Sequence, residues 1–332
     1  MILITGGAGY IGSHTALQFL KDGFEVVIFD SLEKGHIETI ETLKNEGNLQ
    51  FVKGDLKNFE DIKNVFKNFK INAVIHFAGY IEVEESVRNP EKYYKNNVIG
   101  TKNLLEAMKE AGIKNIVFSS TCAVYGEPKY LPLDENHPKN PVNPYGETKL
   151  KTEEMLKEYD NKYGIKSVIL RYFNAAGADS SGKTGEWHIP ETHLIPNILK
   201  SVLNEAKVFK IYGDDYETKD GTCIRDYVNV EDMALAHKKA YNYLLKNNKS
   251  DVFNIGTSDG YSVKEVFETA KKVTGQKIKY EISKRRKGDC AKLTADTTKA
   301  KQILDWQAEK TLKESIKSAY EWEKKLNSNP DK

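Results

Sequence analysis

The sequence MILITGGAGYIG, residues 1–12, decides the fold. Residues 1–5 form an apolar run that is too short for a helix, and residues 13–20 have helical periodicity. The glycines between them, which include Gly6, Gly9 and Gly12, let the backbone come close to a pyrophosphate. The N-terminus of the following helix offers unpaired N–H groups and the positive end of its dipole. This order predicts a strand, a glycine turn and a helix that together bind a dinucleotide.

A second apolar run, residues 26–30, ends in Asp30, about twenty residues after the glycines. A carboxylate at this point accepts hydrogen bonds from both hydroxyls of an adenosine ribose and repels a 2′-phosphate. We therefore expect the cofactor to be NAD and not NADP.

The alternation of strand and helix patterns continues along the chain. Further strands are predicted at 50–53, 73–77, 116–120 and 167–170, with helices at 62–69 and 98–111. This order is typical of an α/β protein with a doubly wound parallel sheet of the Rossmann type. We expect residues 1–174 to form this NAD-binding domain and residues 175–332 to form a smaller C-terminal α/β region that mainly binds substrate. Some elements of that second region are expected to pack back on the first domain.

The second region has its own helix and strand patterns. Helices are predicted at 195–205, 231–245, 262–274 and 312–324, and short strands at 208–212 and 253–255.

Residues directly after the strands are candidates for a binding site, because ligands of such sheets lie beyond the carboxyl ends of the strands. These candidates are Asp55, Leu56, Phe77, Ala78, Gly79, Thr121, Arg171, Tyr172, Phe173 and Asn174. Asn96, in a polar break before a helix, joins them.

The stretch Asn143-Pro144-Tyr145-Gly146-Glu147-Thr148-Lys149 predicts the start of a helix, because asparagine is a good N-cap and proline suits the first helical position. Tyr145 and Lys149 then lie one turn apart on the same face. An ammonium group within a few ångströms stabilises a phenolate and lowers the pKa of the tyrosine, so the pair is suited to proton transfer. The hydroxyl of Thr121 would take part in this proton transfer.

These motifs together resemble the extended short-chain dehydrogenases/reductases, and within that superfamily the family of UDP-glucose 4-epimerases. The resemblance covers nearly the whole chain. It rests on the glycine turn, residues 54–56, 76–79, 96–97, 119–126 and 170–174, the pair Tyr145 and Lys149, and most specifically on residues 212–227.

The resemblance implies an isomerase of galactose metabolism that interconverts UDP-galactose and UDP-glucose with NAD. Tyr145, supported by Lys149 and by the positive nicotinamide ring, would take the proton from the hydroxyl on carbon 4 while NAD accepts the hydride. The transient 4-keto sugar would turn about its link to the diphosphate and receive the hydride on its other face. NAD is regenerated in every cycle, so it is expected to stay bound.

The resemblance also implies which residues form the site. The catalytic residues are Tyr145, Lys149 and Thr121. The cofactor-binding residues are Gly6, Gly9, Tyr10, Ile11, Gly12, Asp30, Ser31, Leu32, Asp55, Leu56, Phe77, Ala78, Gly79, Asn96, Tyr145, Lys149 and Phe173. The substrate-binding residues are Thr121, Asn174, His193, Leu194, Lys210, Tyr212, Arg225, Arg286, Asp289 and Leu293, with the two arginines on the diphosphate and Asp289 accepting hydroxyls. No metal is expected.

Three positions depart from the family pattern. Ile81 stands where many members carry lysine, and His193 stands where many carry asparagine. Leu293 aligns with a position that is tyrosine in some members and smaller in others. A smaller residue leaves room for a 2-acetamido group, so we hypothesise that UDP-N-acetylhexosamines are also accepted.

Two rival functions stay open. Another NAD-dependent nucleotide-sugar epimerase or a 4,6-dehydratase would share the fold, but such dehydratases typically carry acidic residues after the strand-end threonine, where this chain has Cys122 and Ala123. A regulator that binds NAD without turnover commonly lacks the tyrosine and the lysine that this chain retains.

Composition limits the partners. The 332 residues include 50 basic and 48 acidic ones, and this balance argues against a nucleic-acid or membrane-surface partner. Cys122, Cys223 and Cys290 lie far apart without metal-ligand spacing, as expected in a reducing compartment such as the cytoplasm. Family members are commonly homodimers, and residues 87–111 predict two consecutive helices that would pair, although packing on the sheet explains the same pattern.

Overall fold

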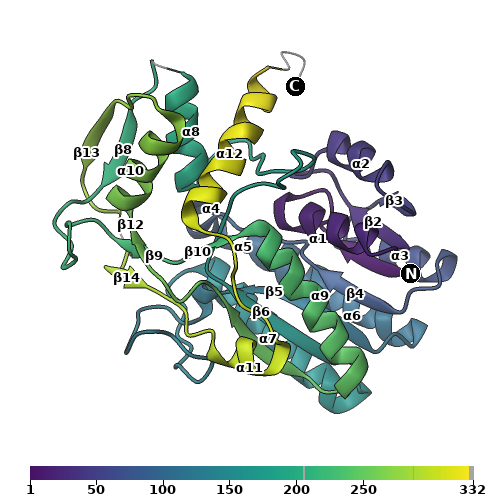
Figure 1. The fold of residues 1–332 in the computed structure, drawn as a ribbon. Coiled ribbons are helices and arrows are strands. Elements are labelled where there is room, and N and C mark those ends of the chain that lie inside the picture. The colour runs from purple at the N-terminus through teal and green to yellow at the C-terminus, as the bar shows by residue number, and fades with distance from the viewer. Residues whose placement is uncertain (205, 287, 329–332) are drawn as a thin grey trace.

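The computed structural model describes residues 1–204, 206–286 and 288–328. Within them, a seven-stranded parallel sheet runs in the order β3-β2-β1-β4-β5-β6-β11 (Figure 1). The strands are β1 (Ile2–Thr5), β2 (Val26–Asp30), β3 (Leu49–Lys53), β4 (Ala73–His76), β5 (Asn115–Thr121), β6 (Lys166–Tyr172) and β11 (Asp251–Ile255). The strand order reverses between β1 and β4, which places a binding crevice beyond the carboxyl ends of these two strands. The predicted doubly wound sheet is confirmed.

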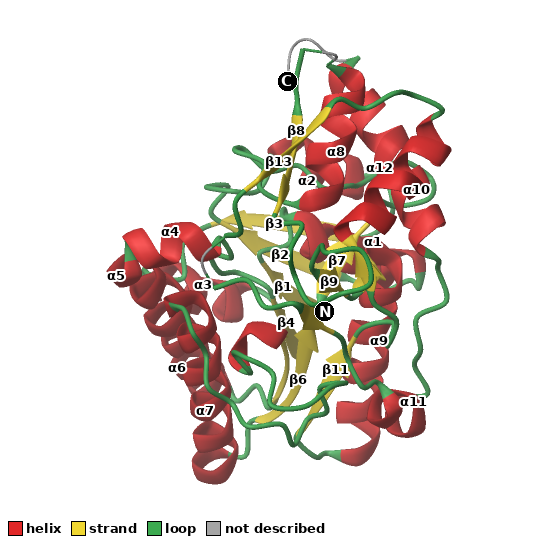
Figure 2. Cartoon of the chain, turned by 90° about the vertical axis from the view of Figure 1, so that its left-hand side faces the viewer, coloured by secondary structure: helices red, strands yellow, loops and turns green. Residues whose placement is uncertain are grey.

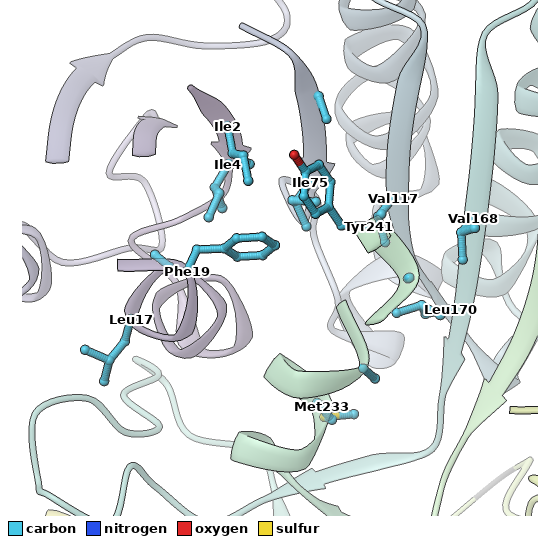
Figure 3. Close-up of a cluster of buried hydrophobic side chains, with 14 of the residues drawn as sticks. Ile2, Ile4, Leu17, Phe19, Ile75, Val117, Val168, Leu170, Met233 and Tyr241 are labelled. Carbon is cyan, nitrogen blue, oxygen red and sulfur yellow. The ribbon is translucent and has the colours of Figure 1, made fainter. Parts of the chain in front are cut away.

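Helices cover both faces of this sheet. One face packs against α3 (Phe59–Asn68), α6 (Gly100–Ala111) and α7 (Pro144–Tyr163), and the other against α1 (Tyr10–Lys21) and α9 (Val230–Asn247). The strands are apolar on both sides, because a parallel sheet is covered by helices on each face. Ile2 and Ile4 point toward α1, while Leu3 between them packs into the opposite core. Figure 3 shows the first of these cores, where Phe19 of α1 and Tyr241 of α9 meet Ile75, Val117 and Leu170 of the sheet.

A smaller lobe follows the half of the chain that contains the glycine turn and most of the sheet (Figure 2). Its helices α8 (Leu194–Leu203), α10 (Val263–Thr274) and α12 (Leu312–Asn327) pack together with β8 (Phe209–Tyr212), which pairs with β13 (Tyr280–Ser283). The remaining short strands are β7 (Asn174–Ala176), β9 (Ile224–Arg225), β10 (Tyr227–Asn229), β12 (Tyr261–Ser262) and β14 (Lys292–Leu293). The predicted helices and strands of this region are all present, and residue 205 of the first predicted helix lies outside the described residues.

Part of the second half of the chain returns to the main sheet. β11 pairs with β6 and forms the edge strand there, α9 packs along α1, and α11 (Thr298–Leu304) contacts α9 and β11. Residues 1–174 therefore do not complete the sheet by themselves.

The region around residues 83–111 differs from the sequence prediction. A helix was expected at 98–111, but the helical chain begins at α4 (Val83–Arg88), breaks at Asn89, and continues through α5 (Pro90–Tyr93) and a π-helical turn at Tyr94–Ile99 into α6. Asn89 caps α5 with its side chain and Pro90 occupies the first helical position, which explains the restart. Asn96 consequently lies inside a helix and not in a polar break.

The structure also contains the short helix α2 (Ile37–Lys44), which the sequence patterns did not predict, and Ile40 and Leu43 bury it against the core. No helix among the described residues combines the length and the apolar character needed to cross a lipid bilayer.

Candidate active site

The glycine turn between β1 and α1 leaves no room for side chains. Gly6 has a φ of +72°, and a Cβ added there would lie 2.6 Å from the backbone nitrogen of Ala78. A Cβ on Gly12 would lie 2.2 Å from the carbonyl oxygen of Gly6. No side chain caps α1, whose N-cap is Gly9. The first turn of α1 thus meets the chain after β4 at the crevice, as a pyrophosphate site requires.

Asp30 ends β2 beside this turn. Its Oδ2 accepts a hydrogen bond from the backbone N–H of Ala8 at 3.0 Å, and its Oδ1 accepts one from Leu32 at 2.8 Å. Burial raises the pKa of Asp30. Leu32 has a φ of +61°, which is unusual for a leucine and marks backbone strain at this point. Each carboxylate oxygen has a second lone pair, so Asp30 can still accept ribose hydroxyls.

Asn97 is a positioning residue that the site prediction left out. Its Oδ1 accepts from the backbone N–H of Tyr80 at 2.8 Å, and its Nδ2 donates to the Tyr80 carbonyl at 3.0 Å and to the Thr148 hydroxyl at 3.2 Å. Asn96 donates to the same Oδ1. Asn97 therefore fixes the loop after β4, which contains Phe77, Ala78 and Gly79, against α7. The two adjacent amides were the signal in the sequence.

The proposed catalytic helix begins as predicted. Asn143 caps α7 by accepting a hydrogen bond from the backbone of Gly146 at 2.9 Å. The Thr121 hydroxyl lies close enough to the Tyr145 phenol to lower its pKa. One turn along α7, Lys149 is 3% exposed and its Nζ donates to the carbonyl oxygen of Ser119 at 2.8 Å. The end of β5 and the start of α7 thus bring the three predicted catalytic side chains to one place.

The pKa of Tyr145 differs from the sequence prediction. Lys149 was expected to lower this pKa, but burial raises it to about 12, against an opposing contribution from the Thr121 hydroxyl. Burial also lowers the pKa of Lys149 to about 8, which Glu153 partly opposes. The physical reason is that both groups are withdrawn from water, which disfavours the phenolate and the ammonium alike. The Lys149 ammonium donates its hydrogen bond to the Ser119 carbonyl.

A buried pair of side chains lies near Tyr145. The Tyr172 hydroxyl at the end of β6 bonds to Nε2 of His237, and burial raises the pKa of Tyr172, with the charge of Tyr145 adding to the rise and Ser119 opposing it. His237 Nδ1 lies 2.8 Å from the carbonyl oxygen of Met233, and burial lowers the pKa of His237 to about 3. The neutral ring therefore donates from Nδ1 and accepts from Tyr172 at Nε2.

Arg171, also at the end of β6, has a structural role. Its Nε and Nη2 donate to the two carboxylate oxygens of Glu153 at 2.9 and 2.6 Å, and its Nη1 donates to the Tyr125 hydroxyl at 2.9 Å. Arg171 is 2% exposed. This buried ion pair links β6 to α7. The Arg171 guanidinium is therefore not free to bind a ligand in the crevice.

The predicted diphosphate residues lie together at the edge of the smaller lobe. Arg225 donates to the carbonyl oxygens of Ile224 and Cys290, each at 2.9 Å, and its Nη2 lies 3.4 Å from Asp289 Oδ1. The guanidinium of Arg286 lies 4.0 Å from the ring centre of Tyr212. These contacts hold Arg225 beside the Asp289 carboxylate and Arg286 against the Tyr212 ring.

The two halves of the site meet through a small apolar cluster. Phe173 belongs to it, and Cys122 and Leu293 pack against it. Leu293 stands opposite Arg225 in the pairing of β14 with β9. Cys122 follows Thr121 in the chain. Burial raises the pKa of its thiol, and the charge of Arg225 opposes that rise. Leu293 therefore lies beside Arg225 and against the cluster that Cys122 also contacts.

The other predicted substrate residues have well-defined places. Asn174 donates from both its backbone nitrogen and its Nδ2 to the Asp226 carbonyl. Lys210 lies on β8, two residues before Tyr212, and is exposed, with Nζ 3.0 Å from Glu281. His193 is the N-cap of α8 and Leu194 begins that helix, but the His193 side chain makes no capping bond.

Several predicted cofactor residues contact the protein through their side chains. The Tyr10 hydroxyl donates to the Gly177 carbonyl at 2.6 Å, so its ring ties the glycine turn to the second half of the chain. Asp55 lies 3.1 Å from Lys57 Nζ, and Leu56 is buried. Ile11 packs against the core beside α1, Ser31 follows Asp30, and Ile81 is largely exposed.

Comparison with known proteins gives consistent matches. Residues 3–319 match the family model described as GDP-mannose 4,6 dehydratase. A UDP-glucose 4-epimerase of Lactobacillus helveticus is 49% identical over 97% of this chain and 97% of its own. A UDP-glucose 4-epimerase structure from Stenotrophomonas maltophila, with bound NAD and formylated UDP-arabinopyranose, is 34% identical with a TM-score of 0.95 and covers 98% of each chain. The UDP-Glc/GlcNAc 4-epimerase from Campylobacter jejuni is 44% identical, with a TM-score of 0.85, over 98% of this chain and 99% of that one.

Proposed function

Because the chain belongs to the GDP-mannose 4,6 dehydratase family of extended short-chain dehydrogenases/reductases, and its full-length relatives are UDP-glucose 4-epimerases, we propose that it interconverts UDP-galactose and UDP-glucose. It is an isomerase that inverts carbon 4 of the sugar through a transient 4-keto intermediate, and it uses NAD. The observation that carries this function is the proximity of the Thr121 hydroxyl to Tyr145, whose pKa it lowers, with Lys149 one turn away, at the carboxyl end of the sheet.

The cofactor fits the residues that are present. The Cβ-free turn at Gly6 and Gly12, the uncapped start of α1 and the buried Asp30 carboxylate suit a pyrophosphate and an adenosine ribose. The other proposed cofactor residues are Gly9, Tyr10, Ile11, Ser31, Leu32, Asp55, Leu56, Phe77, Ala78, Gly79, Asn96, Tyr145, Lys149 and Phe173. NAD, when bound, accepts the hydride from carbon 4 and returns it.

Tyr145 is the base that accepts a proton while the hydride is transferred. As phenolate it accepts the proton of the carbon-4 hydroxyl, and Thr121 holds that hydroxyl in place. The ammonium of Lys149 stabilises the phenolate. Burial around both residues excludes water, which strengthens these interactions.

The diphosphate is held at the other end of the substrate. Arg225 and Arg286 offer planar forks that match phosphate oxygens, and Asp289 accepts sugar or ribose hydroxyls. Inversion requires the 4-keto sugar to turn over while the diphosphate stays fixed. The apolar Leu293 beside Arg225 forms no hydrogen bond with its side chain that would hold the sugar in one orientation.

The absence of a bulky ring at Leu293 also supports activity on UDP-N-acetylhexosamines. A leucine leaves space for a 2-acetamido group where a tyrosine would fill it. The 44% identical Campylobacter jejuni enzyme, which acts on both UDP-Glc and UDP-GlcNAc, favours this extension.

The deciding experiment is to incubate the purified protein with UDP-galactose, without added NAD, and to follow the formation of UDP-glucose. Conversion supports both the epimerase reaction and a cofactor that stays bound. Conversion only after NAD is added would mean that the cofactor is held weakly. No conversion in either case would refute this substrate and favour another 4-epimerase substrate or the NAD-sensing regulator.

Homodimerisation and a cytoplasmic location stay predictions. A second copy of the chain is supported by exposed apolar side chains along α4 and the π-helical turn, among them Val87 at 62% and Tyr94 at 42% exposure. Analytical ultracentrifugation of the protein and of Val87→Glu would test the dimer, because a charge in an apolar interface should favour the monomer.

A further inference from the structure

A cluster of histidine and glutamate side chains lies just before α8. Among the described residues, Glu186, His188, Glu191 and His193 each bring one ligand atom to within 4.8 Å of the others. His193 Nδ1 lies 2.5 Å from Glu186 Oε1 and 3.5 Å from Glu191 Oε1. His188 Nδ1 lies 3.2 Å from the same oxygen of Glu186. The sequence prediction of a metal site relied on cysteine spacing, which cannot reveal a cluster of histidine and glutamate.

The two carboxylates are withdrawn from water. The side chains of Glu186 and Glu191 are 7% and 4% exposed. Oε2 of Glu191 is buried and has no hydrogen-bond partner within the described ranges, and the nearest ammonium, Lys200 Nζ, lies 3.9 Å away. A buried carboxylate oxygen without a hydrogen bond is costly, so this atom indicates a cation that would complete the site.

Neighbouring elements bring further titratable groups close to this cluster. Glu323 of α12 is buried, and burial raises its pKa to about 7, with Lys200 opposing and Glu191 and Glu186 adding to the rise. Burial and the charges of Glu186 and Glu191 likewise raise the pKa of Tyr10 on α1. Lys200 and Lys207 are the lysines that face this group. Against the effect of burial, Glu186 and Glu191 raise the pKa of His193 to about 10, so a bound cation would displace the proton of this imidazolium.

We propose that Glu186, His188, Glu191 and His193 form a binding site for a divalent transition-metal cation, with Zn²⁺ as the best match to two imidazole nitrogens and two carboxylate oxygens. Zinc bonds of about 2.0–2.2 Å in tetrahedral geometry place neighbouring ligand atoms about 3.4 Å apart. The separations of 3.2 and 3.5 Å agree with this spacing, and the His193–Glu186 pair needs to open by about 1 Å.

The position of the site suggests what the cation would stabilise. Glu186 and His188 belong to a loop that is tied to the cofactor half, since His36 stacks on Trp187 at 3.6 Å. Glu191 and His193 lead directly into α8. A cation would link this loop to the start of α8. A His193 ring that binds the cation through Nδ1 keeps its proton on Nε2 as a hydrogen-bond donor. This inference does not depend on the proposed reaction.

The test uses the full-length protein with its cofactor, freed of metal by a chelator and dialysed. Titration with Zn²⁺ against a chromophoric competitor gives stoichiometry and affinity, and Co²⁺ reports coordination by its visible absorption. We expect one Zn²⁺ per chain and a higher melting temperature with Zn²⁺. His188→Ala and Glu191→Gln should each weaken binding by about tenfold or more, whereas His36→Asn, a nearby histidine outside the cluster, should not.

Two results would overturn the proposal: no Zn²⁺ binding by the unmodified protein, or equal binding by the unmodified protein and both cluster variants. Circular dichroism and retained NAD show whether each variant is folded. The isosteric Glu191→Gln keeps the test decisive even if His188→Ala does not fold.

Discussion

Lys149 Nζ donates a hydrogen bond to the carbonyl oxygen of Ser119 at 2.8 Å, and burial brings the lysine pKa down to about 8. The ammonium is therefore present below about pH 8 and is lost above it. In the proposed reaction this charge supports the Tyr145 phenolate, whose own amount rises with pH because the pKa of Tyr145 is about 12. kcat/KM for UDP-galactose should therefore rise up to about pH 8 and then level off, because further ionisation of Tyr145 is offset by loss of the Lys149 ammonium. A profile measured from about pH 6 to about pH 10 checks this, and a continued rise above about pH 8 would contradict the role of Lys149.

Replacing Tyr145 by phenylalanine removes the proposed base and leaves the ring. Turnover should fall by about 10²- to 10⁴-fold, because general acid–base catalysis contributes on this order. Bound NAD, measured after denaturing the purified variant, should stay at the level of the unmodified protein. Unaffected turnover would refute Tyr145 as the base, and loss of NAD would show a second role in holding the cofactor.

Arg225→Lys keeps the charge but loses the planar fork. We expect KM for UDP-galactose to rise by about tenfold or more with a smaller change in kcat, because bidentate contacts to phosphate are lost. Arg285→Lys is the matched control, since Arg285 pairs with Asp215 and packs on Tyr216 at the surface. Equal effects of the two substitutions would argue against a specific grip by Arg225.

Leu293→Tyr should narrow the substrate range. A tyrosine ring would occupy the space proposed for the 2-acetamido group, so kcat/KM for UDP-N-acetylglucosamine should drop by about tenfold or more while that for UDP-galactose changes little. The two substrates are compared with the same preparation. If the unmodified protein does not turn over UDP-N-acetylglucosamine even at high concentration, the wider specificity is wrong.

Arg171→Met should destabilise the fold and not act on the site directly. Leaving Glu153 buried without its partner should lower the free energy of unfolding by about 3–5 kcal/mol. Arg88→Met, which breaks the exposed pair with Glu84, should cost less than about 1 kcal/mol. Urea denaturation measures both, and similar small losses would show that the buried pair contributes little.

The sequence predicted those parts of the fold and site that depend on local patterns. The glycine turn, Asp30 at the end of β2 and the Asn143 cap of α7 all follow from residue type and spacing, and the structure places them as predicted. The raised pKa of Tyr145 was not predictable, because it depends on how deeply β5 and α7 bury the phenol. The strained backbone of Leu32 was equally unpredictable from the sequence, since leucine rarely has a positive φ.

Long-range contacts account for the rest. The partner of Arg171 is eighteen positions away in sequence, and Asn97 meets Tyr80 only because a π-helical turn presents it. Nothing in the spacing of Glu186 and His193 shows that both are drawn to one point beside α8. Such pairs depend on tertiary packing, which residue patterns alone do not encode.

The return of β11 to the sheet has a consequence for how the protein is made. During translation β6 emerges early and waits as an unpaired edge until Asp251–Ile255 has left the ribosome. At about 5–20 residues per second this wait lasts several seconds, and an open edge strand can pair with other nascent chains. A gene shortened after codon 174 would leave that edge open permanently. The cofactor-binding half is therefore expected to aggregate when it is expressed without the rest.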